Sequence, residues 1–148
     1  MNRNDKKEAL NLPDYTINNI LIAGNWMNEK FSEHLKQYAL SIQQYKVLRS
    51  LRDLNGAPSD LLTLQVGMIS KNSNTTRLVE KLRLKGLISR IQNEENRRKV
   101  DIRITETGLN LLDEIDITQT NFEKSTVSNL NTNELKTLNK LLNKLKNT

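Results

Sequence analysis

The chain has 148 residues and a net charge of +6, and 27% of its residues are charged while only 4% are aromatic. It contains no cysteine and a single histidine, His34, which excludes a disulfide framework, a cysteine nucleophile, and thiolate or imidazole-rich metal sites. No apolar run approaches the roughly 20 residues of a membrane span, and the N-terminus lacks the apolar region of a signal peptide. We therefore expect one soluble, cytoplasmic domain over residues 1–148, without a metal, a cofactor or a membrane partner.

A long first helix is predicted over about residues 14–38, where apolar side chains recur at intervals of three and four. Asp14 is the expected N-cap of this helix. The stripe consists of Ile17, Leu21, Gly24, Met27, Phe31 and Leu35.

A second helix is predicted over about residues 44–54. Ser41 and Gln44 have the spacing of a capping box, in which each side chain binds the backbone of the other residue. The pair Asn55-Gly56 is expected to end this helix, because both residue types tolerate a left-handed backbone.

A short third helix and a longer fourth helix follow, at about residues 60–68 and 72–85. Ser59 or Asp60 is expected to cap the third helix, and Gly86 to end the fourth. The residues of the fourth helix that are expected to face the core are Thr75, Leu78, Val79 and Leu82.

Two strands are predicted next, at residues 87–92 and 99–105, joined by a polar loop over residues 93–98. The second strand alternates strictly between apolar and polar residues, which is typical of a strand with one buried face. Its apolar positions, expected to fix the hairpin to the core, are Val100, Ile102 and Ile104.

Two further helices complete the chain. Thr105 is the expected cap of the first, and Asn131 with Glu134 the expected capping box of the second. The stripe of the first comprises Gly108, Leu112, Ile115, Gln119 and Phe122. The stripe of the second comprises Leu135, Leu138, Leu142 and Leu145.

The order of these elements predicts a mainly α fold with a small β-hairpin. A short helix, a turn and a second helix form a helix-turn-helix, and the added hairpin makes it winged, over about residues 41–105. The second helix of such a unit presents its N-terminal residues to base edges, for which amides, hydroxyls and guanidinium groups are suited. Ser73 and Asn74 are equally ordinary capping residues. The expected DNA contacts of this helix are Asn72, Ser73, Asn74, Thr76, Arg77 and Lys81.

The positive charge is concentrated in this region. Residues 71–103 contain ten Lys or Arg against four Asp or Glu, a balance of +6, and the rest of the chain contains thirteen of each. A localised basic block indicates a polyanionic partner. Its densest cluster is Arg97, Arg98 and Lys99, placed where a wing reaches phosphates or a minor groove. The alternative interpretation of this cluster is a solvated hairpin tip.

The segments SNTTRLVEKLRLKGLISR and NEENRRKVDIRITETG resemble the recognition helix and wing of the MarR family of transcriptional regulators, and LSIQQYKVLRSL resembles its second helix. The resemblance extends from about Asp14 to Leu145. It implies a homodimer formed through helices at about residues 14–38 and 106–147. It also implies a winged helix that reads a palindromic operator in double-stranded DNA, usually as a repressor.

The resemblance also implies roles for individual residues. Arg98 matches the wing arginine that reaches the minor groove, whereas Asn96 stands where an aspartate is usual, and Glu94 or Glu95 could supply that carboxylate. Many members release DNA when a small, often aromatic or phenolic, ligand binds near the dimerisation region. The aromatic residues near that position are Trp26, Phe31, Tyr38 and Tyr45, for which a place in the core is the alternative.

Two other classes of function were weighed against DNA binding. The chain has no glycine-rich phosphate loop, nucleophile elbow or metal-ligand spacing, so an enzyme is not expected. A winged helix that binds RNA or a protein partner without operator recognition stays open. The basic block lacks aromatic residues on which single-stranded bases would stack, which disfavours single-strand binding.

Overall fold

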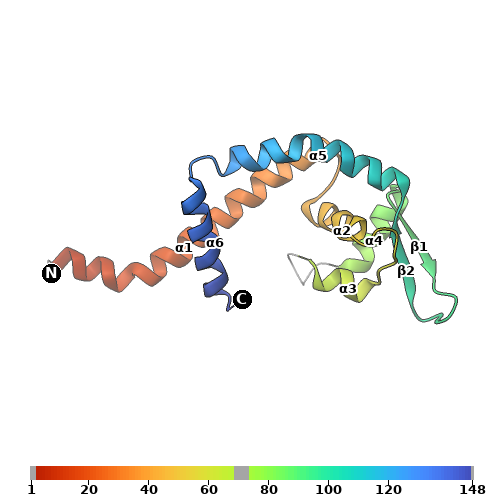
Figure 1. Ribbon diagram of the computed structural model, residues 1–148. Helices are drawn as coiled ribbons and strands as arrows, with labels where there is room; N and C mark the ends of the chain where they lie inside the picture. The colour runs from red at the N-terminus through yellow and green to blue at the C-terminus, as the bar shows by residue number, and fades with distance from the viewer. Residues whose placement is uncertain (1–2, 69–73, 148) are drawn as a thin grey trace. The chain divides into compact units, whose positions relative to one another are not determined.

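A computed structural model describes residues 3–68 and 74–147, and the chain divides into two compact units, residues 1–109 and 110–148. The predicted mainly helical fold with one β-hairpin is confirmed (Figure 1). The helices are α1 (Arg3–Lys36), α2 (Ile42–Arg52), α3 (Leu61–Val66), α4 (Thr75–Leu84), α5 (Glu106–Thr126) and α6 (Thr132–Leu145), and the strands are β1 (Ile88–Gln92) and β2 (Val100–Ile104). Among the helices described, none has both the length and the apolar character needed to cross a bilayer.

The prediction that Asp14 caps the first helix is wrong, because α1 begins at Arg3. Asp14 lies inside the helix and accepts a hydrogen bond from Asn18 Nδ2 at 3.2 Å. Residues 6–10 are strong helix formers. Their favourable helix propensity offsets the loss at Pro13, which lies inside the helix and cannot donate a backbone hydrogen bond.

The predicted apolar stripe of α1 is buried only towards its C-terminal end. Leu35 is fully buried, whereas Ile17 and Leu21 are 57% and 65% exposed. Tyr15 and Ile22 on the same helix are exposed as well. A long exposed apolar surface of this kind is uncommon on a protein that functions as a monomer.

The core of the first unit forms where α2 and α4 pack against each other and against the hairpin. Its central side chains are exposed by no more than 1%. They are Tyr45, Leu48 and Leu51 of α2, Val79 and Leu82 of α4, and Ile102 of β2. Of the predicted inward positions, Thr75, Val79 and Leu82 of α4 and Ile102 of β2 are buried. The other three are only half-buried, namely Leu78, Val100 and Ile104.

The capping box predicted for α2 is present. The Ser41 hydroxyl accepts a hydrogen bond from the Gln44 N–H at 3.2 Å, and the Gln44 carboxamide accepts one from the Ser41 N–H at 3.0 Å. Asn55 and Gly56 follow the helix with φ angles of 50° and 90°, as expected for residues that end it. Local side-chain chemistry thus determines both ends of α2.

Both helices of the helix-turn-helix have a side-chain cap, a carboxylate for α3 and an amide for α4. Asp60 Oδ1 accepts a hydrogen bond from the Thr63 N–H at 2.8 Å at the start of α3. Asn74 Oδ1 accepts one from the Arg77 N–H at 3.0 Å, so α4 begins at Thr75 rather than near residue 72. Both caps satisfy backbone N–H groups that have no partner within their helix.

The end of α4 is fixed at Gly86, which has a φ angle of 72°. Its N–H donates to the Arg83 carbonyl at 2.9 Å, and the Leu87 N–H donates to the Leu82 carbonyl at 3.1 Å. This is a Schellman motif, which requires a left-handed residue and favours glycine there. The neighbouring Lys85 ammonium donates to the Ala39 carbonyl, which ties the end of α4 to the turn between α1 and α2.

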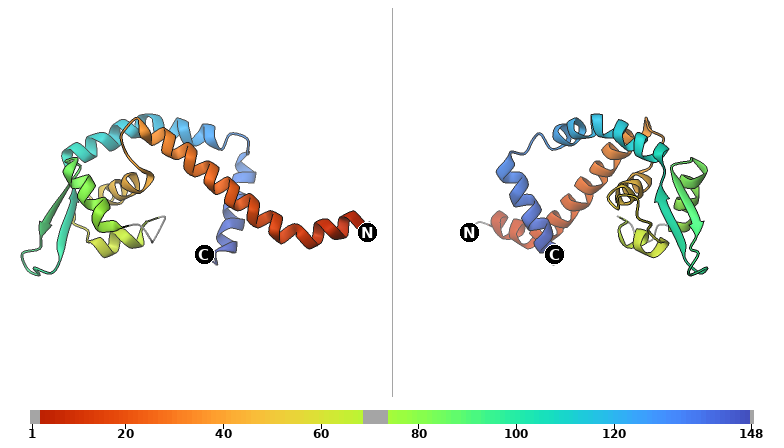
Figure 2. Two further views of the ribbon diagram at one scale, coloured as in Figure 1. Left: turned by 180° about the vertical axis from the view of Figure 1, so that it is seen from behind. Right: turned by 45° about the vertical axis from the view of Figure 1, so that its right-hand side comes forward.

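The hairpin forms a wing beside α4, and its tip projects beyond the neighbouring helices (Figure 2). The strands are antiparallel, with Ile88 opposite Ile104 and Arg90 opposite Ile102. The structure adds a bridge that the sequence did not reveal. Ser59 and Ile102 exchange two backbone hydrogen bonds, both of 2.9 Å, which join β2 to the segment before α3.

The start of α5 packs tightly against the end of α4. Thr105 caps α5 as predicted, since its hydroxyl accepts a hydrogen bond from the Gly108 N–H at 3.1 Å. Gly108 has no room for a side chain. A Cβ atom there would lie 2.7 Å from Ile104 Cγ1 and closer still to the Leu87 carbonyl oxygen. A glycine is therefore required at this close approach.

The change Gly108→Ala is expected to lower the free energy of unfolding by about 1–3 kcal/mol, because the added methyl group must displace the Leu87 backbone. Gly24→Ala is the control, since a Cβ atom there meets nothing within 4 Å. We expect that change to raise stability by about 0.5–1 kcal/mol, because alanine is the better helix former. Denaturant unfolding measures both. A Gly108→Ala protein as stable as the parent would contradict the tight junction.

Candidate nucleic-acid interface

One face of α4 is polar and exposed. Thr76, Arg77 and Lys81 are exposed, whereas Thr75 and Val79 on the opposite face are buried. The structure therefore presents these three predicted contact residues to solvent on one surface. Asn74 is also exposed, and its Oδ1 atom caps the helix. The other two predicted contacts, Asn72 and Ser73, lie outside the described residues.

An open hollow of about 560 Å³ lies between the start of α2 and the N-terminal half of α4. Arg77 and Lys81, one helical turn apart, supply its positive charge, and Ser41 and Gln44 supply polar groups at the start of α2. Within the described part of the chain, no carboxylate forms an ion pair with Arg77 or Lys81. The two cations are thus available to an external anion.

The wing tip exposes the side chains of Arg97, Arg98 and Lys99. Their backbone is held by the loop itself. The Arg97 carbonyl accepts a hydrogen bond from Gln92 Nε2 at 2.6 Å, and the Arg98 N–H donates to Asn96 Oδ1 at 3.1 Å. The Lys99 N–H donates to the Asn96 carbonyl at 2.8 Å. The tip therefore has a defined backbone that carries charged groups into solvent.

Asn96 orders the backbone of Arg98 rather than its guanidinium group. Neither Glu94 nor Glu95 forms an ion pair with Arg98 among the residues that the structure describes. The carboxylate that the family resemblance places beside the wing arginine thus has no substitute here. An aspartate at position 96 could accept the same hydrogen bond from the Arg98 N–H.

A second basic hollow, of about 430 Å³, lies between α4 and the wing. Arg83 and Arg90 line it together with Arg97 and Lys99. Neither Arg83 nor Arg90 was among the contacts predicted from the sequence. The signal for Arg83 was its spacing of seven residues from Thr76, which places both on the exposed face of α4.

Arg83 is positioned by an ion pair within α4. Its Nε and Nη2 atoms donate to the two carboxylate oxygens of Glu80 at 3.0 and 2.7 Å. This hydrogen-bonded pair lowers the pKa of the Glu80 carboxyl, which the charges of Arg83 and Arg90 lower further, and it raises the pKa of Arg83. Both side chains are partly exposed, so the pair orients the guanidinium group more than it stabilises the fold.

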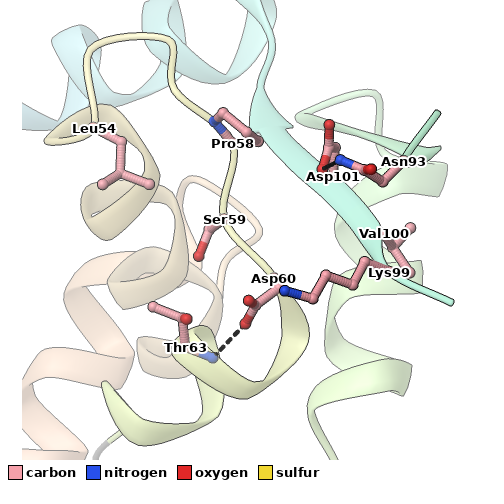
Figure 3. Close-up of a pocket in the computed structure, with 9 residues that line it drawn as sticks. All are labelled: Leu54, Pro58, Ser59, Asp60, Thr63, Asn93, Lys99, Val100 and Asp101. Carbon is pink, nitrogen blue, oxygen red and sulfur yellow. Dashed lines mark hydrogen bonds between the residues drawn. The ribbon is translucent and has the colours of Figure 1, made fainter. Parts of the chain in front are cut away.

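Lys99 faces the start of α3 across a third hollow of about 290 Å³, and Figure 3 shows its side chain pointing toward Asp60. The pKa of Asp60 is lowered mainly by the hydrogen bond that the Thr63 N–H donates to its carboxylate, which caps α3. The charge of Lys99 lowers this pKa further. Lys99 is thus compensated in part from within the protein, unlike Arg97 and Arg98 at the tip.

The four predicted ligand-binding aromatics differ in their surroundings. Tyr45 is buried, and its ring meets the Phe31 ring edge-on with centroids 5.6 Å apart. Tyr38 lies against His34 with centroids 6.1 Å apart, and Lys30 lies over the Trp26 ring. Tyr45 therefore has the core position that was the alternative.

No group of three metal-ligating side chains occurs among the described residues.

Comparison with known proteins finds a family match for part of the chain. Residues 40–100, which hold α2, α3, α4, β1 and the wing tip, match the model of the MarR family. These residues are a MarR-family winged helix. The resemblance found in the sequence is confirmed over this region. A comparison with curated proteins found no match.

Solved structures resemble the chain beyond the MarR-family winged helix. A mutant of MarR from E. coli complexed with operator DNA is 23% identical, with a TM-score of 0.81 over 91% of this chain and 96% of that chain. A MarR transcription factor from Planctomyces limnophilus is 27% identical, with a TM-score of 0.70 over 87% of this chain and 93% of that chain. An organohalide-sensing transcriptional regulator bound to 2,4-dichlorophenol is 21% identical, with a TM-score of 0.83 over 92% of this chain and 80% of that chain.

The cap of α3 makes the stability of this MarR-family winged helix depend on pH. Asp60→Ala is expected to lower the free energy of unfolding at neutral pH by about 0.5–2 kcal/mol. Because the pKa of Asp60 is lowered by folding, its carboxylate stabilises the fold above the unfolded value of about 3.9. That contribution disappears as pH falls through the folded pKa. The difference between parent and variant should therefore shrink in acid.

Asp60→Asn is the matched control, since asparagine keeps a capping oxygen and has no charge to titrate. We expect it to retain most of the stability of the parent and to lose the pH dependence. Denaturant unfolding at several pH values measures all three proteins. A difference between parent and Asp60→Ala that stays constant into acid would show that the carboxylate charge is not involved.

Proposed function

We propose that the chain is a transcriptional regulator that binds double-stranded DNA in a sequence-specific manner, as a homodimeric repressor at a palindromic operator. The observation that carries the proposal is the shared location of two exposed polar surfaces. The polar face of α4 and the cations of the wing belong to one unit, and residues 71–103 hold the whole excess charge of +6. The similar MarR of E. coli is complexed with operator DNA, which supports the proposal.

The two surfaces have different tasks in this proposal. Asn74, Thr76 and Arg77 at the start of α4 contact base edges, where each good contact discriminates by about 1–3 kcal/mol. Lys81, with the wing residues Arg97, Arg98 and Lys99, mainly neutralises phosphates, which adds affinity without selecting a sequence. The unpredicted cations Arg83 and Arg90 belong with this second group, because they line the same hollow as Arg97 and Lys99.

A homodimer is proposed because each unit carries an exposed apolar helix. In the first unit, α1 exposes Ile17 and Leu21. In the second, α6 has no buried residue and exposes Leu138, Leu141 and Leu145 along one helix. Surfaces of this kind are usually covered by a partner. A twofold dimer would also place two winged helices on the two halves of a palindrome.

A small aromatic or phenolic effector is part of the proposal, at or near Trp26, Phe31 and Tyr38, beside the buried Tyr45. A similar regulator is bound to 2,4-dichlorophenol, which supports this chemical class. Trp26 and Phe31 lie five positions apart on α1, and Trp26 is 43% exposed. An effector that packs on Trp26 would act on the helix that is proposed to form the dimer.

DNA binding is tested by a salt titration of duplex operator affinity, with operator fragments selected from genomic DNA. A wing arginine that neutralises one phosphate adds about 0.9 to the slope of log affinity against log salt. Arg98→Ala should therefore lower the slope by roughly 2 per dimer. Lys124→Ala, which removes an exposed cation from α5, should leave the slope unchanged. An equal slope in the parent and Arg98→Ala would mean that the wing does not touch DNA.

Single-stranded RNA and single-stranded DNA serve as competitors in the same assay. The proposal expects excess single strand to leave the duplex complex intact, because the basic surface lacks aromatic side chains for stacking. Displacement by single-stranded RNA at equal concentration would support an RNA-binding winged helix instead. Binding of neither nucleic acid would favour a protein partner and would exclude a role for this protein at an operator.

Dimerisation through α6 is tested by placing charges on its leucine face. The double change Leu138→Asp and Leu145→Asp is expected to weaken self-association by at least about tenfold, because each buried leucine contributes about 1.5–3 kcal/mol. The control is Asn139→Asp with Asn143→Asp, which adds the same charge to the same helix. Analytical ultracentrifugation measures the dissociation constants. Equal constants for the two double variants would place the interface elsewhere.

A further inference from the structure

Asn93, the first residue after β1, makes three side-chain hydrogen bonds at the base of the wing tip. Its Oδ1 atom accepts from the N–H groups of Glu95 and Asn96, at 3.0 and 2.8 Å. Its Nδ2 atom donates to Asp101 Oδ1 at 3.0 Å. The side chain therefore acts as acceptor towards the loop and as donor towards β2. An amide supplies both functions at this length, whereas a carboxylate supplies only the first.

Asp101 connects Asn93 to the body of the first unit through Arg103. Figure 3 shows the Asp101 and Asn93 side chains facing each other beside β2. The second carboxylate oxygen of Asp101 lies 3.7 Å from Arg103 Nη1, and Arg103 Nε donates to the Gly56 carbonyl at 3.2 Å. Gly56 belongs to the turn after α2. A continuous chain of polar contacts thus runs from the helical body through Arg103 and Asp101 to the wing tip.

The far end of this chain determines the backbone of the wing cations. The N–H of Asn96 is held by Asn93, and Asn96 in turn accepts from the N–H groups of Arg98 and Lys99. The Asn93 N–H donates to the Lys99 carbonyl at 3.0 Å, which closes the loop. The Asn93 amide thus binds both N–H groups of the Glu95–Asn96 segment, from which the cation-bearing turn starts.

We propose that Asn93 is a positioning residue for DNA binding, which orients the wing cations through its own amide and is held in place by Asp101 and Arg103. This inference rests on the proposed function. Pre-ordering a binding loop saves the entropy that would otherwise be lost on association. Asn93 itself does not touch DNA. Its effect on affinity passes through the arginines at the tip.

Asn93→Ala removes all three hydrogen bonds without changing the charge. It is expected to weaken operator binding by about three- to tenfold. In an Arg97→Ala and Arg98→Ala background the same change should have little further effect, because the groups it positions are gone. Asn110→Ala, at an exposed position on α5, is the control and should bind as the parent does. Equal losses in both backgrounds would overturn the inference.

Exchanging the two partners gives a rescue test. Asn93→Asp alone would set two carboxylates against each other, whereas Asn93→Asp with Asp101→Asn restores one donor and one acceptor and keeps the net charge of the parent. The exchanged protein should regain affinity to within about threefold of the parent, at the cost of the Arg103 ion pair. An exchanged protein as weak as Asn93→Asp would show that this contact does not position the wing.

Amide hydrogen exchange without DNA separates this inference from the proposed function. The Glu95 and Asn96 N–H groups should exchange slowly in the parent and faster in Asn93→Ala. The unfolding midpoint should change little, because the hydrogen bonds to Glu95 and Asn96 are exposed. Fast exchange in both proteins overturns the inference even if the parent binds duplex DNA. A parent that binds no duplex overturns the proposed function, and the positioning role falls with it.

Discussion

The carbonyl groups of Gly86 and Leu87 hold together the elements on which the interface depends. Thr105 donates its hydroxyl to the Gly86 carbonyl at 2.6 Å and its N–H to the Leu87 carbonyl at 3.0 Å. The last turn of α4, the start of β1, the end of β2 and the start of α5 therefore meet within one short stretch of backbone. Because Gly108 lies directly against it, the relative orientation of α4 and the wing follows from this junction.

The cations of this surface differ in how far the protein itself compensates them. Arg83 is paired with Glu80, Arg103 lies near Asp101, and Lys99 is near Asp60. Within the described ranges, the Arg97 and Arg98 side chains have no such carboxylate. A cation paired with a carboxylate attracts a distant polyanion only weakly. An unpaired cation attracts it more strongly, until salt screens the charge. The attraction is thus concentrated at the tip of the wing and at the N-terminal half of α4.

Features set by neighbouring residues were predictable from the sequence. The capping box of Ser41 and Gln44 and the end of α4 at Gly86 depend on contacts within a few residues, and both are confirmed. The bridge between Ser59 and Ile102 was not predictable, since it joins backbone groups 43 positions apart that any residue could supply. The hollow that joins Arg83 and Arg90 to the wing depends likewise on how α4 packs against β1. The predicted DNA and effector contacts stay predictions.

The construction of the wing tip has a consequence for how such a protein evolves. Its loop conformation comes from backbone groups and from the side chains of Gln92, Asn93 and Asn96, while the side chains at positions 97–99 contribute only their charge. Mutations at those three positions therefore leave the loop intact and cost the fold little. The strength of attraction to a polyanion can drift by single substitutions, independently of the residues on α4 that face it. Selection can tune occupancy and recognition as separate traits.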